Sequence, residues 1–170
     1  MEIEEKSRLL FMRYALPCAG TLVKRHIMTQ KQWDDLIDAV KNGRKVPKDS
    51  EKVFKVAFAA CSMIAMDKKK RFIDSEVIRE YFLFKHDDVI NKRYEEMRDF
   101  DPEACRTKAG TVEEVKEGLA TVKTRSGKGD FRVDFVKDLR KGDTVVIHWD
   151  FVTEKTDQKT ADEMERKRLP

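Results

Sequence analysis

Residues 141–149 read Lys-Gly-Asp-Thr-Val-Val-Ile-His-Trp, and this stretch decides the fold class of the C-terminal part of the chain. Gly142 and Asp143 are residue types that favour tight turns. The residues between Thr144 and His148 are apolar and β-branched, without a polar residue among them. A short unbroken apolar run after a turn is typical of a buried strand. The stretch therefore predicts a hairpin turn that leads into a central β-strand.

The segments before this stretch also predict short strands, because β-branched or alternating residues are separated by turn residues. The expected strands span 111–115, 119–124 and 131–135, with turns at 116–118 and 126–129. Phe151 and Val152 can continue the strand that ends at Trp149. Four or five short strands are too few for a two-sheet sandwich, so we expect a small OB or SH3-like β-barrel, whose closure removes exposed edges.

The period of the apolar residues changes at Asp99-Phe-Asp-Pro102. Before this point apolar residues recur three and four positions apart, which is typical of amphipathic helices. Proline cannot continue a helix and disfavours helix one residue earlier. We therefore predict an α+β protein with a helical bundle over residues 1–102 and a β-barrel domain over residues 103–170. A polar C-terminal helix is expected at 157–168.

Four helices are expected in the N-terminal part. They span 6–16, 29–43, 50–66 and 75–98. Thr29 and Gln32 have the spacing of a capping box, in which each side chain binds the other residue's backbone N–H. The helix at 50–66 is apolar over most of its length, so we expect it to be the most buried helix and to hold Cys61 as a core thiol.

Charged side chains make up 40% of the chain, and their signs nearly cancel, with 36 Lys and Arg against 32 Asp and Glu. A high charged fraction is common in heat-adapted proteins and indicates a thermophilic source. The charge is spread over both halves, so the sequence lacks the concentrated basic footprint of a nucleic-acid-binding protein. We interpret the basic run Lys68–Arg71 as a solvated loop, because no aromatic residue interrupts it.

The three cysteines, Cys18, Cys61 and Cys105, match no zinc-binding spacing. No apolar run approaches the roughly 20 residues that a membrane helix needs, and the N-terminus has no secretory signal pattern. The sequence therefore predicts a protein of the reducing cytoplasm, with free thiols and no membrane partner.

The sequence contains no His-Glu-x-x-His pattern, no glycine-rich phosphate loop and no Ser/His/Asp order. We therefore predict a binding protein rather than an enzyme, and the residues alone point to no cofactor. We interpret His86, beside Asp87 and Asp88, as a solvated surface residue. Cys18 and His26 are two donors only, too few for a metal site by themselves.

Three stretches of the C-terminal part resemble the HypC/HupF family of hydrogenase maturation chaperones. Cys105-Arg-Thr-Lys-Ala-Gly110-Thr-Val112 is similar to the family's opening Cys-x-x-x-Pro-Gly-x-Ile/Val, with Ala109 in place of the proline. The strand–turn–strand pattern at 112–135 follows. Residues 142–152 are similar to the family's Gly-x-x-Val-x-Val-His strand. The resemblance covers residues 104–165, about a third of the chain.

The resemblance implies a small chaperone that binds a maturation scaffold and the hydrogenase large subunit. It also implies that the protein helps to carry iron bearing cyanide and carbon monoxide, engaged by the opening cysteine. In the family this cysteine follows the initiator Met, whereas here Cys105 lies behind about a hundred residues. Iron is the one metal that the resemblance suggests.

Cys105 and His148 are therefore the predicted partner- or metal-binding residues, and Gly110 and Trp149 are secondary candidates. We expect Cys105 and His148 to share one rim of the barrel, with Cys105 partly exposed. Alternation along the strand places one of His148 and Trp149 inward and the other outward. A structural role for His148 stays open.

An RNA-binding barrel is the alternative function, since OB and SH3-like barrels often bind RNA and the sequence pI is about 8.9. The barrel's aromatic residues are few, however. Phe131 and Phe135 are expected on the same face as Val133, in the core, where they cannot stack on bases.

Overall fold

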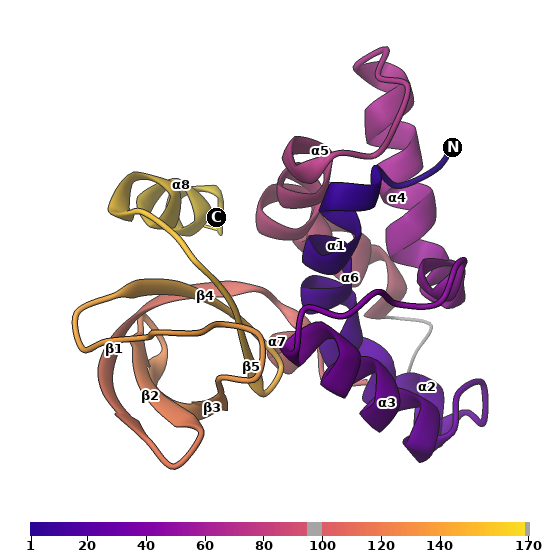
Figure 1. Ribbon diagram of the computed structural model, residues 1–170. Coiled ribbons are helices and arrows are strands. Elements are labelled where there is room, and N and C mark those ends of the chain that lie inside the picture. The colour runs from indigo at the N-terminus through magenta and orange to yellow at the C-terminus, as the bar shows by residue number, and fades with distance from the viewer. Residues whose placement is uncertain (95–99, 169–170) are drawn as a thin grey trace. The chain divides into compact units, whose positions relative to one another are not determined.

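The computed structural model describes residues 1–94 and 100–168, and the chain divides into two compact units, Met1–Lys85 and His86–Pro170. The N-terminal unit is helical, and the C-terminal unit contains a closed five-stranded barrel and a C-terminal helix (Figure 1). The predicted α+β fold class is confirmed. The second unit begins before Pro102, and the domain boundary at 102/103 stays a prediction about independent folding.

The N-terminal unit packs around a cluster of buried aromatic rings. Its α-helices are α1 (Arg8–Ala15), α2 (Ala19–Lys24), α3 (Gln30–Lys41), α4 (Lys55–Asp67) and α5 (Ser75–Arg79). Short 3-10 turns at Glu5–Ser7, Leu16–Cys18 and Ser50–Val53 join or precede them. Phe82 stacks on Tyr14 with ring centroids 4.9 Å apart and meets the edge of Phe11 at 6.0 Å. These contacts hold α1 against Glu80–Lys85, the helical segment that follows α5 and contains Phe82.

The helix starts follow the sequence signals. Thr29 and Gln32 form the expected capping box at the start of α3. Asp74 caps α5, since its carboxylate accepts a hydrogen bond from the Val77 backbone N–H at 3.0 Å. Gly43 follows α3 with a φ of 62°, a conformation that glycine adopts without steric cost.

Two helix predictions are corrected. The helix α4 is not the most buried one, because only one of its faces is covered. Its side chains Met63 and Met66 are about two-thirds exposed, at 66% and 65%. The long helix expected at 75–98 is not regular either. A π-helical segment, Glu80–Lys85, separates α5 from α6 (His86–Tyr94). The part of this prediction at 95–98 lies outside the described residues.

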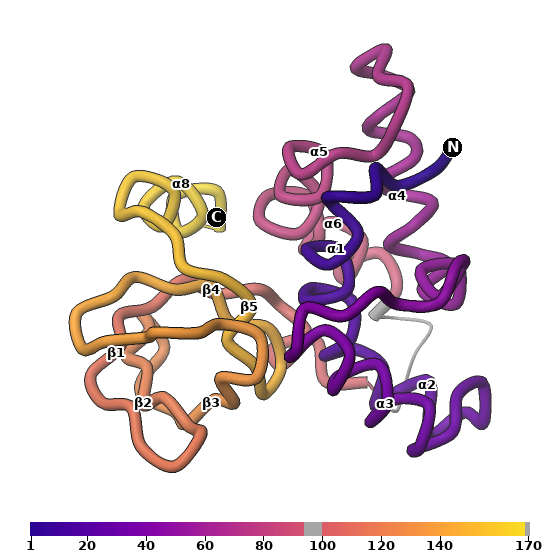
Figure 2. The backbone as a smooth tube through the Cα atoms, viewed as in Figure 1, coloured from indigo at the N-terminus to yellow at the C-terminus, as the bar shows by residue number. Residues whose placement is uncertain are grey.

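The barrel closes with the strand order β1-β2-β3-β5-β4, and β4 pairs with β1. The strands are β1 (Lys108–Lys116), β2 (Leu119–Thr124), β3 (Gly127–Arg132), β4 (Thr144–His148) and β5 (Phe151–Lys155). Figure 2 follows the chain through this meander and back across the barrel. The barrel core consists of six buried side chains: Val112, Ala120, Val122, Val145, Ile147 and Val152.

The barrel confirms one hairpin and corrects two strand boundaries. Glu117 and Gly118 both have positive φ in the tight turn between β1 and β2, as that turn type requires. The strand expected at 131–135 instead spans Gly127–Arg132, so residues 127–129 belong to the strand and not to the expected turn at 126–129. Phe135 lies beyond the strand and stacks on Phe151 at 4.9 Å. Phe151 does not continue β4, since Trp149 has a φ of 51° and reverses the chain into β5.

Two further helices belong to the C-terminal unit. The short helix α7 (Pro102–Cys105) precedes β1, and α8 (Gln158–Arg168) contacts β1 and β4. Asp157 caps α8 by accepting the Thr160 backbone N–H at 2.7 Å. Ala161 and Met164 are its buried residues, so α8 uses its narrow apolar face to cover the barrel.

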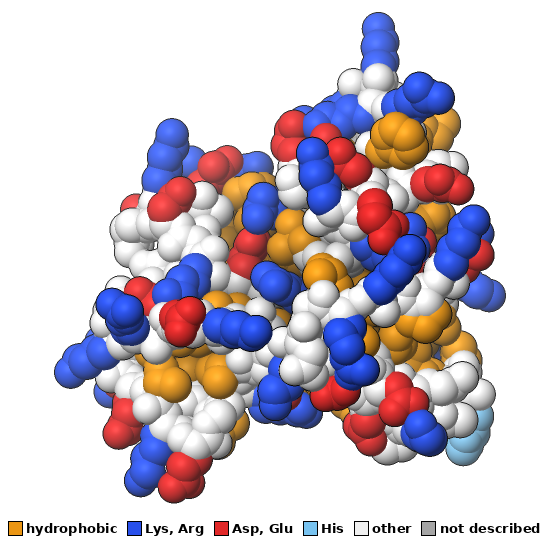
Figure 3. Space-filling model, in the orientation of Figure 1, with side chains coloured by type: hydrophobic (Ala, Val, Ile, Leu, Met, Phe, Trp, Pro, Cys, Tyr) orange, Lys and Arg blue, Asp and Glu red, His pale blue; other side chains and the backbone are white. Residues whose placement is uncertain are grey.

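Acidic and basic side chains are interspersed on the visible surface (Figure 3), in keeping with the nearly balanced charge. Within the part of the chain that the structure describes, no helix has both the length and the apolar character needed to cross a membrane.

Candidate functional site

Cys105 is held at the junction of α7 and β1. Asp101 caps α7 by accepting hydrogen bonds from the backbone N–H groups of Glu103 and Ala104. The Ala104 carbonyl accepts the Trp149 backbone N–H at 3.1 Å, which ties the end of α7 to the β4–β5 turn. Cys105 is therefore placed beside the end of β4, in line with the pairing of Lys108 with Ile147.

His148 is the last residue of β4 and is completely buried, whereas Trp149 is half-buried. The structure brings the two predicted site residues together, with Cys105 Sγ 3.7 Å from His148 Nε2. The prediction that Cys105 is partly exposed is wrong, because only 3% of it is exposed. Imidazole rings lie beside its sulfur in place of solvent.

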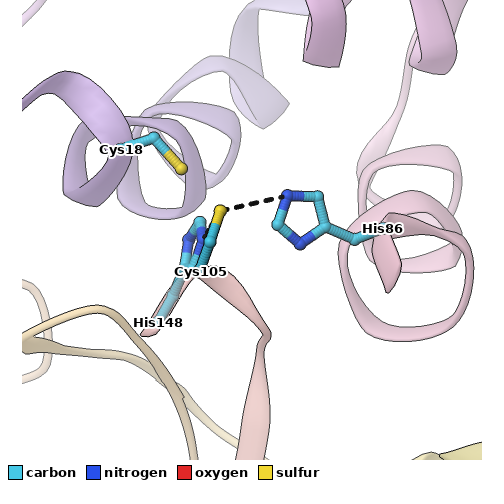
Figure 4. Close-up of side chains that lie close together, drawn as sticks. All are labelled: Cys18, His86, Cys105 and His148. Atoms are coloured by element: carbon cyan, nitrogen blue, oxygen red, sulfur yellow. Dashed lines mark hydrogen bonds between the residues drawn. The ribbon is translucent and has the colours of Figure 1, made fainter. Parts of the chain in front are cut away.

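His86 is a further candidate residue that the sequence pattern did not indicate. It is the first residue of α6, it is 6% exposed, and its Nε2 lies 4.0 Å from Cys105 Sγ (Figure 4). Its ring meets that of His148 edge to face, with centroids 5.1 Å apart. The interpretation of His86 as a solvated residue is wrong. Its position four residues from both Phe82 and Ile90, on the apolar face of the expected helix, was the one sequence signal of its burial.

The three side chains form one donor cluster within the C-terminal unit, hereafter the Cys-His cluster: His86, Cys105 and His148. Their ligand atoms lie within 4.8 Å of one another. Burial, followed by electrostatic repulsion from His148 and then from Arg168 and Arg106, holds the pKa of His86 well below its usual value. The His86 ring is therefore neutral at pH 7, the form in which imidazole binds metals.

Ion pairs fix the helix that carries His86. The Asp87 carboxylate lies 3.3 Å from Arg106 and 3.3 Å from Arg168. Arg106 also donates a hydrogen bond to Asn91 at 2.6 Å and to Glu103 at 2.9 Å. Since Arg106 directly follows Cys105, the same residue orients both α6 and the end of α7.

The secondary candidates, Gly110 and Trp149, have structural reasons for their positions. A Cβ at Gly110 would lie 2.5 Å from Val122 Cγ1 and 2.8 Å from the Lys123 carbonyl oxygen, so β1 needs glycine there. Trp149 packs edge to face on Phe100, with ring centroids 6.1 Å apart. Gly110 therefore serves the packing of β1 against β2, whereas Trp149 directly follows His148 of the Cys-His cluster.

The other cysteines belong to the N-terminal unit. Cys61 is fully buried in α4, as predicted, and burial raises the pKa of its thiol to about 12. Cys18 is half-buried at the end of the 3-10 turn Leu16–Cys18, and His26 is exposed. Cys18, which Figure 4 also labels, belongs to the N-terminal unit, and the Cys-His cluster comprises residues of the C-terminal unit alone.

The C-terminal unit is thus a small closed barrel with a buried thiol and two imidazoles where the chain enters β1. Comparison with known proteins agrees with the sequence resemblance, since residues 105–166 match the HupF/HypC family. The match begins at Cys105 and includes all five strands and most of α8, but it leaves His86 outside. No curated protein matches the chain.

Proposed function

We propose that this protein is an accessory protein of hydrogenase maturation, which binds a protein partner and helps to assemble a metal centre. The observation that carries the proposal is the contact between Cys105 and His148. By the sequence resemblance these residues correspond to the family's opening cysteine and strand histidine, and both lie within residues 105–166, which match HupF/HypC. Their contact at 3.7 Å supports a shared role. By that resemblance, the partner is a maturation scaffold or the hydrogenase large subunit.

The donor chemistry suits an iron cargo. A thiolate is a soft, electron-rich ligand, and a neutral imidazole also binds iron well. Burial keeps the thiol of Cys105 away from solvent, which limits its oxidation. In this role the chain binds and releases a metal and does not turn over a substrate. We therefore propose that it is a binding protein and not an enzyme.

The RNA-binding alternative has weaker support. Two of the barrel's aromatic rings, Phe135 and Phe151, are 3% and 2% exposed and stack on each other. Base stacking needs aromatic rings that face solvent on neighbouring strands. No feature of the described residues favours this alternative over the metal and partner role.

Capture of a partner tests the proposal. The tagged protein is co-expressed with a hydrogenase large-subunit precursor from the same organism and purified under reducing, anaerobic conditions. We expect a stable complex of the iron-loaded protein. We expect Cys105→Ser to weaken it at least about tenfold, because the complex would form around iron that the buried thiol helps to hold, and even the loss of an outer-shell partner of a metal ligand costs about 10–100-fold in metal affinity.

Cys61→Ala is the matched control, because Cys61 is an equally buried thiol in the N-terminal unit. It should leave capture unchanged, and thermal melting verifies that both variants are folded. The proposal fails if neither the large-subunit precursor nor a maturation scaffold is captured by the wild-type chain. It also fails if Cys105→Ser captures the partner as well as the wild type does.

A further inference from the structure

His86 extends the site beyond the segment that resembles a known family. It belongs to α6, nineteen residues before Cys105, yet its Nε2 faces the same sulfur as His148 Nε2 does. We propose that His86 is a third metal ligand, so that His86, Cys105 and His148 together bind one divalent transition-metal ion. The inference rests on the proposed function, because it adds a donor to the same site.

The distances fit a common metal ion. Metal–thiolate bonds of about 2.3 Å and metal–imidazole bonds of about 2.0–2.1 Å place sulfur and nitrogen about 3.6 Å apart in tetrahedral geometry. The sulfur–nitrogen distances here are 3.7 Å to His148 and 4.0 Å to His86. Shifts of a few tenths of an ångström would therefore bring each imidazole nitrogen to the distance from the sulfur that a shared metal ion requires.

The fold also provides support for the ligand at position 86. The Asp87 carboxylate contacts Arg106 and Arg168, which fixes the first turn of α6 relative to α7 and α8. The π-helical segment Glu80–Lys85 ends directly before His86. Such segments occur frequently at functional sites, because the wider turn changes which side chains face inward.

The donor set selects the class of metal. One thiolate and two neutral imidazoles suit iron(II), cobalt(II) and zinc, whereas magnesium and calcium prefer oxygen ligands. Three protein donors hold an ion more tightly than two. A ligand from outside the family-like segment would thus make this chain retain its metal longer than that segment could alone.

Cobalt titration of the full chain tests the inference, with Co²⁺ as a spectroscopic substitute for Fe²⁺. Metal-free protein is titrated anaerobically, and thiolate-to-cobalt charge-transfer absorption is followed in the near ultraviolet. We expect one Co²⁺ per wild-type chain. His86→Ala should weaken binding at least about tenfold, because even the loss of an outer-shell partner of a metal ligand costs about 10–100-fold.

Two further variants sharpen the result. His26→Ala is the control, since His26 is an exposed histidine of the N-terminal unit, and it should bind Co²⁺ as the wild type does. His86→Cys supplies a second thiolate at the same position and should increase the charge-transfer absorption per bound ion. This variant decides the question if His86→Ala does not fold.

The outcomes separate the two proposals. If Cys105→Ser and His148→Ala lose Co²⁺ while His86→Ala and His86→Cys behave like the wild type, His86 is not a ligand and the proposed function stands. If the wild-type chain binds no Co²⁺, the third-ligand inference fails together with the metal role of the site.

Discussion

At the scale of single residues, the site combines two donors that the sequence indicated with one that it did not. Cys105 and His148 could be named as candidates from the family resemblance, and the structure adds that their side chains lie in contact. His86 could not be distinguished from a surface histidine, since Asp87 and Asp88 follow it directly. Only the fold shows that the carboxylate of Asp87 is occupied by two arginines while the His86 ring is buried.

Gly110 gives a residue-scale prediction about stability. Gly110→Ala should destabilise the barrel by about 1–3 kcal/mol, the usual cost of overpacking, because the added methyl would overlap Val122 and the Lys123 backbone. Urea unfolding measures the difference. Glu114→Ala, at an exposed position of the same strand, is the control and should cost less than about 1 kcal/mol.

A different result would assign Gly110 to binding rather than packing. An unchanged free energy of unfolding for Gly110→Ala, combined with weaker partner capture, would show that the glycine is needed for the partner's approach.

At the scale of helices and strands, local signals were predictable and tertiary ones were not. The capping box at Thr29 and the turn at Glu117-Gly118 are short-range effects, and both are present as expected. The apolar composition of α4 predicted more burial than the helix has, because an apolar sequence does not reveal how many of its faces neighbouring helices cover. The π-helical segment and the reversal of chain direction at Trp149 depend on packing across the fold, so no local sequence pattern predicts them.

At the scale of the whole molecule, the two compact units meet at residues 85/86, whereas the spacing of the apolar residues changes only at Pro102. The second unit includes α6, whose Asp87 and Asn91 contact Arg106. These contacts are long-range in sequence, which is why Pro102 was the more visible boundary. The barrel itself contains all of its strands between residues 108 and 155.

We predict that residues 103–170 fold alone into a β-rich domain with a cooperative thermal transition, because this fragment retains the closed barrel and α8. Far-UV circular dichroism and melting measure this. The longer fragment 86–170 should melt higher, by about 4–8 °C for each 1 kcal/mol that the α6 contacts contribute. An unfolded or purely helical spectrum for 103–170 would place the folding boundary elsewhere.

X-ray absorption at the iron edge tests most directly whether Cys105 and His148 bind a metal together, as we propose. The full chain is loaded anaerobically with Fe²⁺ and compared with Cys105→Ser. We expect one sulfur neighbour at about 2.3 Å, a typical metal–thiolate distance, together with imidazole scattering, and loss of the sulfur neighbour in the variant. A wild-type spectrum with oxygen and nitrogen neighbours only, unchanged by Cys105→Ser, would contradict it.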